Sequence, residues 1–443
     1  MRSMVGLGWG TNSMYRAFKL LSALLAGLFL GAGASATVPE MPPFQGRAEQ
    51  LVPFLNGEAK PEDMFTPRFL SQIPVAQLDT ITAGARAQYG RAQSVTVAEQ
   101  PELHRGTVRV RMEKATLRIL LVIQPDAPHQ IEGLLIEAAD QHDDSMAAVL
   151  AELGALPGSV SFAVARLGDG KPEMLYQLNG GTPGAIGSEF KLFLLAELSR
   201  QIAAGERKWT DVVTLDRRSH PSGILQDWPE GSPLTLHTLA TLMISISDNT
   251  ATDALLHTLG REKVEALLPA LGIADPSRTR PLLSTREATA IKLSRFPAIA
   301  EAWAAADEKG RRALLPRVER LPDDALDLTR YATTPRLIET AEWFANAEDM
   351  VRTMDWLRRN AGEEVLKILA INPGLGPAAA EKFAYMGFKG GSEPGVMALT
   401  FLLRTKRGGW LALSASWNDP KASLDELRFQ ALVNRAVALA AGL

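Results

Sequence analysis

The chain has 443 residues, of which 46% are hydrophobic and 22% charged, and its formal charge at neutral pH is −3. This length suffices for two or three domains, and the nearly balanced charge provides no basic surface of the kind that nucleic acid requires. The absence of cysteine excludes disulfides, thiolate catalysis, cysteine-ligated metals and a lipoprotein anchor, and the six histidines lack the spacing of metal ligands, so we expect neither a metal nor a cofactor.

Residues 1–36 have the features of a signal peptide. Arg16 and Lys19 precede the apolar run LLSALLAGLFLGAGA, and small residues ending at Ala36 fit a cleavage site. The apolar run is short for a membrane-spanning helix. We therefore expect cleavage and export to the periplasm or the extracellular space, with no stable membrane insertion afterwards; a retained anchor is the alternative. Met14 is an alternative start.

Residues 46–140 form the first predicted domain. Helical patterns over 46–57 and 65–90 are followed by strand-like alternation over 106–124 and 130–138. Helices followed by an antiparallel meander indicate a small α+β domain. It contains no combination of acid, base and nucleophile, so we expect a packing or binding role.

The second predicted domain covers residues 143–443. A β-hairpin pattern at 159–179 is followed by mostly helical patterns, and two further strand patterns occur at 395–404 and 409–417. Strands at both ends suggest one sheet built from both ends of the domain. A helix is expected over 423–441, with Ser423 as its N-cap and Glu426 at capping-box spacing.

The segment GSEFKLFLLAEL, residues 187–198, places Ser188 three positions before Lys191 at the start of an apolar helix. Side chains at this spacing share one helix face. An amine among apolar side chains has its charged form disfavoured, so its pKa falls and it can take a proton from a hydroxyl. We therefore predict that Lys191 activates Ser188. A chance match with a lysine at the helix surface is the alternative.

Two further motifs follow in the chain, Ser247-Asp248-Asn249 and, at the start of a late strand pattern, Lys389-Gly390-Gly391. S-x-x-K, S-D-N and K-T-G are together the signature of class A β-lactamases and penicillin-binding proteins. The sequence resembles this family over roughly residues 155–443, and YATTPRLIETAEWF is similar to its Thr-Thr-Pro helix start.

The resemblance implies a β-lactamase-like fold, with an antiparallel sheet flanked by helices, and an acyl-enzyme mechanism. It makes Ser188 the nucleophile and Lys191 its activating partner. Ser247 would pass a proton to the leaving group, helped by Lys389, and Asp248 would fix the loop. The residues that would bind substrate are Asn249, Gly390, Gly391 and Ser392. The backbone N–H groups of Ser188 and Ser392 would form the oxyanion hole.

The sequence departs from the family pattern at two points. Gly390 stands where the family usually has Thr or Ser, so a hydroxyl for a substrate carboxylate is missing unless Ser392 replaces it. The glutamate that activates water for deacylation is also unclear. Counting from the second motif points near Glu287, and counting back from Thr334-Pro335 points near Glu319; a surface salt bridge is the alternative for both. The two counts disagree because the interval between the second and third motifs is long enough for an inserted helical hairpin.

The domain order, with STRE after the second motif and KGGSEPG in the third, is similar to the two-domain β-lactamase-like proteins of clavulanic acid biosynthesis, whose front domain looks like ketosteroid isomerase or cystatin. We expect an exported serine hydrolase that acts on a small-molecule substrate, with β-lactam hydrolysis preferred. The alternatives are an ester or other acyl hydrolase, a peptidoglycan peptidase, and a sensor of β-lactams or cell-wall fragments that is acylated without turnover. The oligomeric state and the true substrate stay open.

Overall fold

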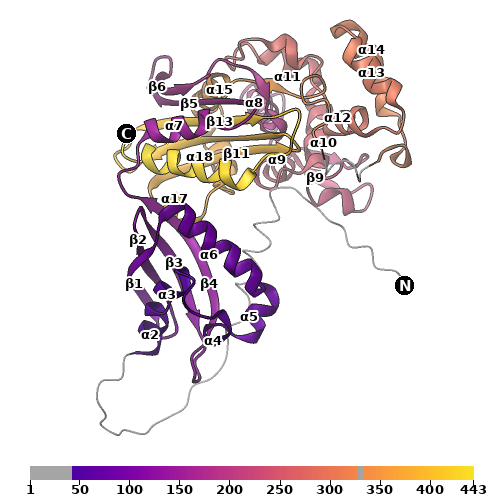
Figure 1. Ribbon diagram of the computed structural model, residues 1–443. Helices are drawn as coiled ribbons and strands as arrows, with labels where there is room; N and C mark the ends of the chain where they lie inside the picture. Colours follow the sequence, from indigo (N-terminus) through magenta and orange to yellow (C-terminus); the bar gives the residue numbers. More distant parts are fainter. Residues whose placement is uncertain (1–41, 328, 330–333) are drawn as a thin grey trace, which may run out of the picture. The chain divides into compact units, whose positions relative to one another are not determined.

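The computed structural model describes residues 42–327, 329 and 334–443, so the predicted signal peptide lies outside the described residues. Within them the chain divides into a front unit, residues 42–145 with 376–379, and a large unit, residues 146–375 with 380–443 (Figure 1). None of the described helices combines the length and the apolar character needed to cross a membrane.

The front unit is built from helices followed by an antiparallel sheet, as predicted. Its helices are α2 (Pro43–Glu49), α3 (Leu51–Leu55), α4 (Pro61–Met64), α5 (Pro67–Gln72) and α6 (Val75–Tyr89). Its strands pair in the order β1 (Ala92–Glu102), β2 (Arg105–Met112), β3 (Ala115–Ile123) and β4 (Ile131–Gln141). The sequence analysis missed β1, because this strand is exposed along most of its length and lacks a regular apolar alternation. Pairing with β2 holds it in the sheet.

A five-stranded antiparallel sheet forms the centre of the large unit. Its order is β11 (Phe383–Glu393), β12 (Val396–Thr405), β13 (Trp410–Asn418), β5 (Ser159–Leu167) and β6 (Glu173–Leu178). The prediction of one sheet built from both ends of this unit is therefore confirmed. Lys389 lies well inside β11 and not at the start of a strand, because pairing with β12 extends the strand back to Phe383.

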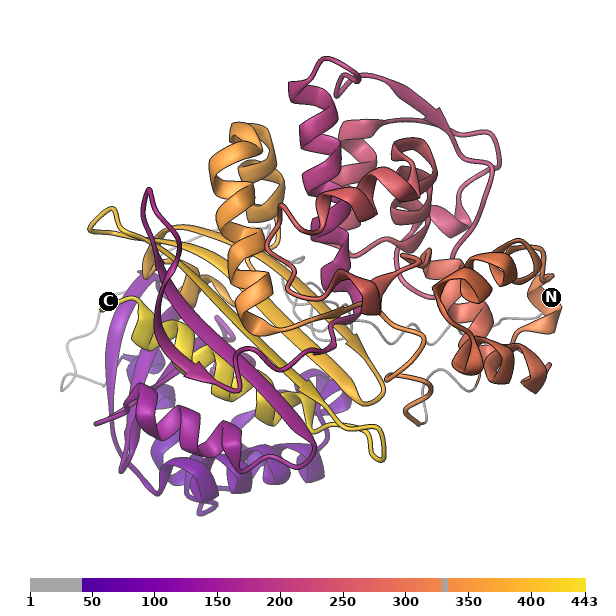
Figure 2. The ribbon, with the colours of Figure 1, turned by 90° about the horizontal axis from the view of Figure 1, so that it is seen from above.

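Helices cover both faces of this sheet. Figures 1 and 2 show α7 (Met146–Gly154) and α18 (Glu426–Ala440) on one face, and α8 (Lys191–Ala203) and α15 (Ala347–Asn360) on the other. The predicted cap of the last helix is wrong. Asp425 is the N-cap and accepts the Arg428 N–H at 3.0 Å, so the helix begins at Glu426 and its N-cap is not Ser423.

The remaining helices follow β6 and precede β11 in the sequence, and the last of them, α17, has its residues 377–379 in the front unit. They are α9 (Leu236–Ser245), α10 (Asn249–Leu259), α11 (Arg261–Leu267), α12 (Thr285–Leu293), α13 (Pro297–Ala305), α14 (Glu308–Glu319), α16 (Gly362–Ala370) and α17 (Pro377–Ala380). Helices α13 and α14 pack against each other at the periphery of the large unit and form a helical hairpin in the long interval between the second and third motifs (Figure 2).

The Thr-Thr-Pro helix start is not found where the sequence suggested it. Residues 331–333 of that segment lie outside the described residues, and no helix begins at Pro335. The next helix, α15, begins only at Ala347, where Asn346 and Asp349 form a capping box that satisfies the first backbone N–H groups.

Candidate active site

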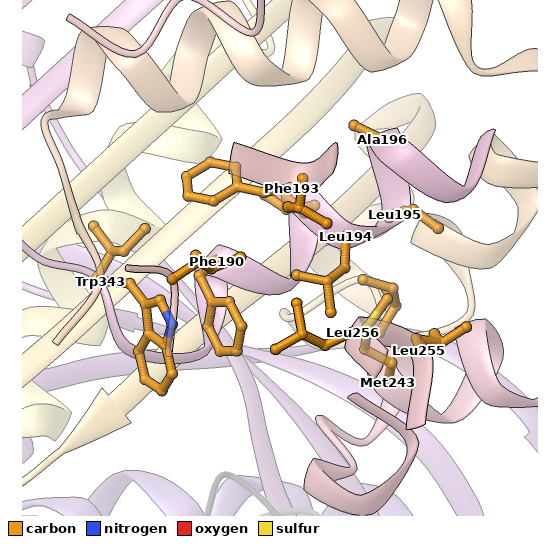
Figure 3. Packing of buried hydrophobic residues seen from close by; sticks show 14 of the residues in the cluster. Phe190, Phe193, Leu194, Leu195, Ala196, Met243, Leu255, Leu256 and Trp343 are labelled. Atoms are coloured by element: carbon orange, nitrogen blue, oxygen red, sulfur yellow. The ribbon is translucent and has the colours of Figure 1, made fainter. Parts of the chain in front are cut away.

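Ser188 lies in a 3-10 turn, Gly187–Phe190, that leads directly into α8. Phe190 and Phe193 are fully buried and anchor this junction in the core (Figure 3). Trp343 stacks on Phe190 with the ring centroids 3.8 Å apart. The apolar positions of the segment therefore point into the core and hold Ser188, which is half-buried, at a fixed place on the wall of a pocket.

The side chain of Lys191 is fully buried and hydrogen-bonds to the Ser247-Asp248-Asn249 loop. Its Nζ donates to Ser247 O at 2.7 Å, to Ser247 Oγ at 3.0 Å and to Asn249 Oδ1 at 2.8 Å. Burial, and next the charge of Lys389, hold the pKa of Lys191 well below its usual value, against the opposing charges of Asp248 and Asp253. Among the described residues no hydrogen bond joins Lys191 to Ser188.

Asp248 fixes the loop that carries Ser247, as predicted. Its carboxylate caps α10 by accepting the Ala251 N–H at 2.8 Å and also accepts the N–H groups of Ile224 and Leu225 at 2.7 and 3.0 Å. Ser247 has a φ of +58°, which costs a non-glycine residue free energy and persists only where neighbouring contacts enforce it. The strained turn holds the Ser247 hydroxyl between two lysines.

Lys389 is the second of these lysines. Its Nζ lies 3.1 Å from Ser247 Oγ and donates to Gly390 O at 2.5 Å. Burial lowers the pKa of Lys389 to about 7, and the charge of Glu189 opposes this shift. Two ammonium groups beside one hydroxyl would repel each other, so the low pKa values allow one of the amines to be neutral and to exchange a proton with Ser247.

The predicted third motif passes directly behind Ser188. A Cβ atom on Gly391 would lie 2.1 Å from Ile186 O and 2.5 Å from Ser188 N, so only glycine allows the two backbones to come this close. As a result Ser188, Asn249 and Ser392 line the same pocket. At Gly390 the space for a side chain is occupied, because a Cβ there would lie 2.8 Å from Phe388 Cζ.

Three charged residues that the sequence analysis missed line the same pocket: Lys292, Glu342 and Glu393. The Lys292 ammonium pairs with Glu342 and donates to Glu393 Oε1 at 2.6 Å. Their side chains are at most 10% exposed. Burial, and next the neighbouring Glu342, raise the pKa of Glu393 to about 8. A sequence signal existed for Glu393, which directly follows Ser392.

Neither glutamate suggested by counting along the chain lines this pocket. Glu287 is buried, forms a capping box with Ser284, and accepts two hydrogen bonds from Arg261 at 2.7 and 2.9 Å. Glu319 pairs with Arg217 and lines a different cavity. Both therefore form ion pairs, the alternative considered for them, although that of Glu287 is buried rather than on the surface.

No group of three or more histidine, aspartate or glutamate side chains within the described ranges could hold a metal ion. The geometry instead brings together two buried amines, a hydroxyl between them, and a pocket that contains a second hydroxyl at Ser188. Acylation of a serine requires this set of groups.

Similar folds occur among solved structures. A β-lactamase from Sphaerobacter thermophilus shares 23% identity, with a TM-score of 0.45 and coverage of 67% of this chain and 94% of that one. A β-lactamase from Chitinophaga pinensis shares 16% identity, with a TM-score of 0.44 and coverage of 67% and 97%. PBP-A shares 14% identity, with a TM-score of 0.45 and coverage of 67% and 94%. A search of curated proteins found no match.

A family model gives the assignment. The model described as the β-lactamase enzyme family matches residues 143–371, more than half of the 443-residue chain. The matched segment includes Ser188, Lys191 and the Ser247-Asp248-Asn249 loop, and it ends before Lys389. The protein belongs to the β-lactamase enzyme family.

Proposed function

We propose that the protein is a serine hydrolase that opens β-lactams through an acyl-enzyme at Ser188. The observation that carries the proposal is the continuous set of contacts from Lys191 through Ser247 to Lys389, next to a pocket lined by Ser188. The buried amines have lowered pKa values, so a neutral amine is available as a base near neutral pH.

In the proposed reaction Ser188 Oγ attacks the lactam carbonyl and loses its proton to neutral Lys191. Lys191 is bonded to Ser247 and Asn249 before substrate binds, so binding must bring Ser188 Oγ within reach of Nζ. The close approach of the backbones at Gly391 and Ser188 supports an oxyanion hole formed by the N–H groups of Ser188 and Ser392. The lactam C–N bond then breaks, and the nitrogen takes the Ser247 proton, which a lysine replaces.

Hydrolysis of the acyl-enzyme needs a base that activates water. We propose that a carboxylate of the cluster formed by Lys292, Glu342 and Glu393 is this base, because the cluster lines the Ser188 pocket and Glu287 and Glu319 do not. Glu342→Gln and Glu393→Gln, compared with Glu287→Gln, test this step. The variant that lacks the base should accumulate a long-lived acyl-enzyme. Equal turnover in all three variants would exclude the cluster as the source of the base.

The third motif bears on the substrate. A Gly390 backbone covered by the Phe388 ring has no hydroxyl with which to bind a substrate carboxylate. We therefore propose that simple penicillins are weaker substrates than lactams or esters without this carboxylate. A pair of substrates of the same leaving-group reactivity, one with the carboxylate esterified, tests this point through the ratio of their kcat/KM values.

A second function is favoured by one observation. Lys292 pairs with both Glu342 and Glu393, and a carboxylate held by an ammonium is a weak base for water. An enzyme with this arrangement would be acylated quickly and deacylated slowly, as in a sensor. A stopped-flow experiment with nitrocefin and a p-nitrophenyl ester distinguishes the two functions. Continuous turnover supports the hydrolase, and a single burst of one product per protein molecule supports the sensor.

We further propose that the protein is exported and that its order of units reflects kinship with the two-domain proteins of clavulanic acid biosynthesis. The signal-peptide features of residues 1–36 support export, and the small α+β unit ahead of the large unit supports the kinship. Expression of the full chain in a bacterial host tests export. A mature protein that begins near Thr37 in the periplasmic fraction is expected, and an uncleaved cytoplasmic protein would contradict it.

A further inference from the structure

A second cavity lies in the large unit, separate from the Ser188 pocket. Its volume is about 560 Å³, within the range of about 300–1,000 Å³ that is typical of sites for small molecules. Residues of the segment 215–230, the start of α12, and the end of α14 with the residues that follow it form its wall. None of the described residues that line it also lines the Ser188 pocket. The proposed reaction therefore does not use this cavity.

The wall of this cavity contains four arginines and four acidic residues, and two of the arginines are paired within it. Arg217 forms an ion pair with Glu319, and Arg286 donates to Asp323 Oδ1 at 2.7 Å. Each of these pairs is neutral overall. They shape the wall, and the charges available to a ligand are those of the other residues.

Arg218 and Arg320 are the other two arginines, and each uses one donor on the protein itself. Arg218 Nη2 donates to Trp228 O at 3.3 Å, and Arg320 Nε donates to Pro316 O at 2.7 Å. Among the described residues, neither guanidinium has a carboxylate oxygen within 4.0 Å. A guanidinium carries several N–H donors in a planar fork that matches a carboxylate. The two arginines therefore have most of their donors available for a carboxylate from a ligand.

The same wall contains an aromatic ring and two further carboxylates. Trp228 is 39% exposed and offers a large, flat, apolar face. Glu230 has no hydrogen-bonding or ion-pair partner in the part of the chain that the structure describes, and the mostly exposed Asp216 lies 3.9 Å from Arg217 Nε. An ionised carboxylate only accepts hydrogen bonds, so its partner on a ligand is an O–H or N–H group.

We infer that this cavity binds an acidic sugar, a polyhydroxy ring that carries a carboxylate. The carboxylate accepts hydrogen bonds from Arg218 and Arg320. The hydroxyl groups donate to Glu230 and Asp216, and the C–H face of the ring packs on Trp228. A neutral sugar lacks the carboxylate and an aromatic acid lacks the hydroxyl groups, so each of these matches only part of the wall. The inference goes beyond the proposed function and does not depend on it.

The test is a titration with glucuronate, followed by NMR of the Trp228 indole N–H, which is assigned by its absence from Trp228→Phe. Glucuronate should give a saturable shift of this resonance. Glucose, which has the ring without the carboxylate, and benzoate, which has the carboxylate without the hydroxyl groups, should each bind about tenfold more weakly or worse, because each loses hydrogen bonds to charged groups. No saturable shift with glucuronate, or equal affinity for glucose or benzoate, overturns the inference.

Two variants with a matched control locate the bound sugar. Arg218→Gln and Arg320→Gln should each weaken glucuronate binding by about tenfold or more, and both residues are exposed, so the variants should fold. Arg317→Gln is the control, because Arg317 is an exposed arginine of α14 that does not line the cavity. It should bind glucuronate as the wild-type protein does. Wild-type affinity in both cavity variants, or an equal loss in Arg317→Gln, overturns the inference.

Discussion

Gly391→Ala is a change whose effect follows directly from the geometry behind the nucleophile. The new Cβ would lie 2.1 Å from Ile186 O and 2.5 Å from Ser188 N, whereas real Cβ contacts are essentially never shorter than 3.0 Å. The carbonyl of Ile186 and the new methyl group must therefore separate by at least 0.9 Å. Both contacts are with backbone atoms, so rotation of a side chain cannot relieve them.

The separation should cost more activity than stability. A displacement of about 1 Å at a reacting group lowers rates by roughly 100-fold, because the attacking atom and the oxyanion donors lose their alignment. The strain should destabilise the fold by about 1–3 kcal/mol, the range typical of overpacking. The acylation rate constant with nitrocefin, measured by stopped-flow, and the free energy of unfolding in urea test the two effects.

Gly409→Ala is the control, because a Cβ there would meet only Thr405 Oγ1 at an ordinary 3.6 Å. It should acylate at the wild-type rate. If Gly391→Ala is folded and also acylates at the wild-type rate, then the close approach of β11 to Ser188 does not position the reacting groups, and the argument for the oxyanion hole fails.

Three other changes separate structural from chemical roles. Gly390→Thr should lower stability by about 1–3 kcal/mol without improving acylation by a penicillin, because Phe388 Cζ lies 2.8 Å from the new Cβ; improved acylation in the single variant would refute this. Glu287→Gln should lose roughly 3–5 kcal/mol of unfolding free energy, since it leaves the largely buried Arg261 guanidinium without its carboxylate partner, but should deacylate normally; a trapped acyl-enzyme would contradict this role. The folded-state pKa of Glu189 is raised from 4.5 to about 8. Between these two pH values the native protein holds a proton that the unfolded chain has released, so the stability of the wild-type protein falls as the pH rises through this range. Glu189→Gln should therefore be about as stable as wild type at pH 5 and more stable by about 1–3 kcal/mol at pH 9. If urea unfolding gives a difference in free energy between the two proteins that does not change with pH, Glu189 does not become a buried charge in this range.

The sequence motifs were informative because each depends on local chemistry. Lys191, Ser247 and Lys389 could be grouped without coordinates, and the structure brings them together through Ser247 Oγ. The contact between Lys191 and Ser188 was expected from their spacing alone. It is absent from the described hydrogen bonds because the Lys191 amine donates to the Ser247 and Asn249 oxygens instead.

The features that the sequence analysis missed depend on residues far apart in the chain. Lys292, Glu342 and Glu393 come from three separate segments, and counting along the chain cannot show that they meet. The hairpin of α13 and α14 lies between Glu287 and the end of the count at Glu319, so the two counts ended on different residues, and neither of these lines the pocket. Glu189 was passed over because one acidic residue in an apolar segment resembles a surface position, and only the packed sheet shows that it is fully buried.

The central claim is the acyl-enzyme at Ser188, and intact-mass spectrometry of the mature protein with nitrocefin and a penicillin tests it most directly. The account predicts a mass increase of one intact opened lactam per chain, located on the peptide that contains Ser188 and absent from Ser188→Ala. No adduct with either compound over the time course, or an equal adduct on Ser188→Ala, would contradict it.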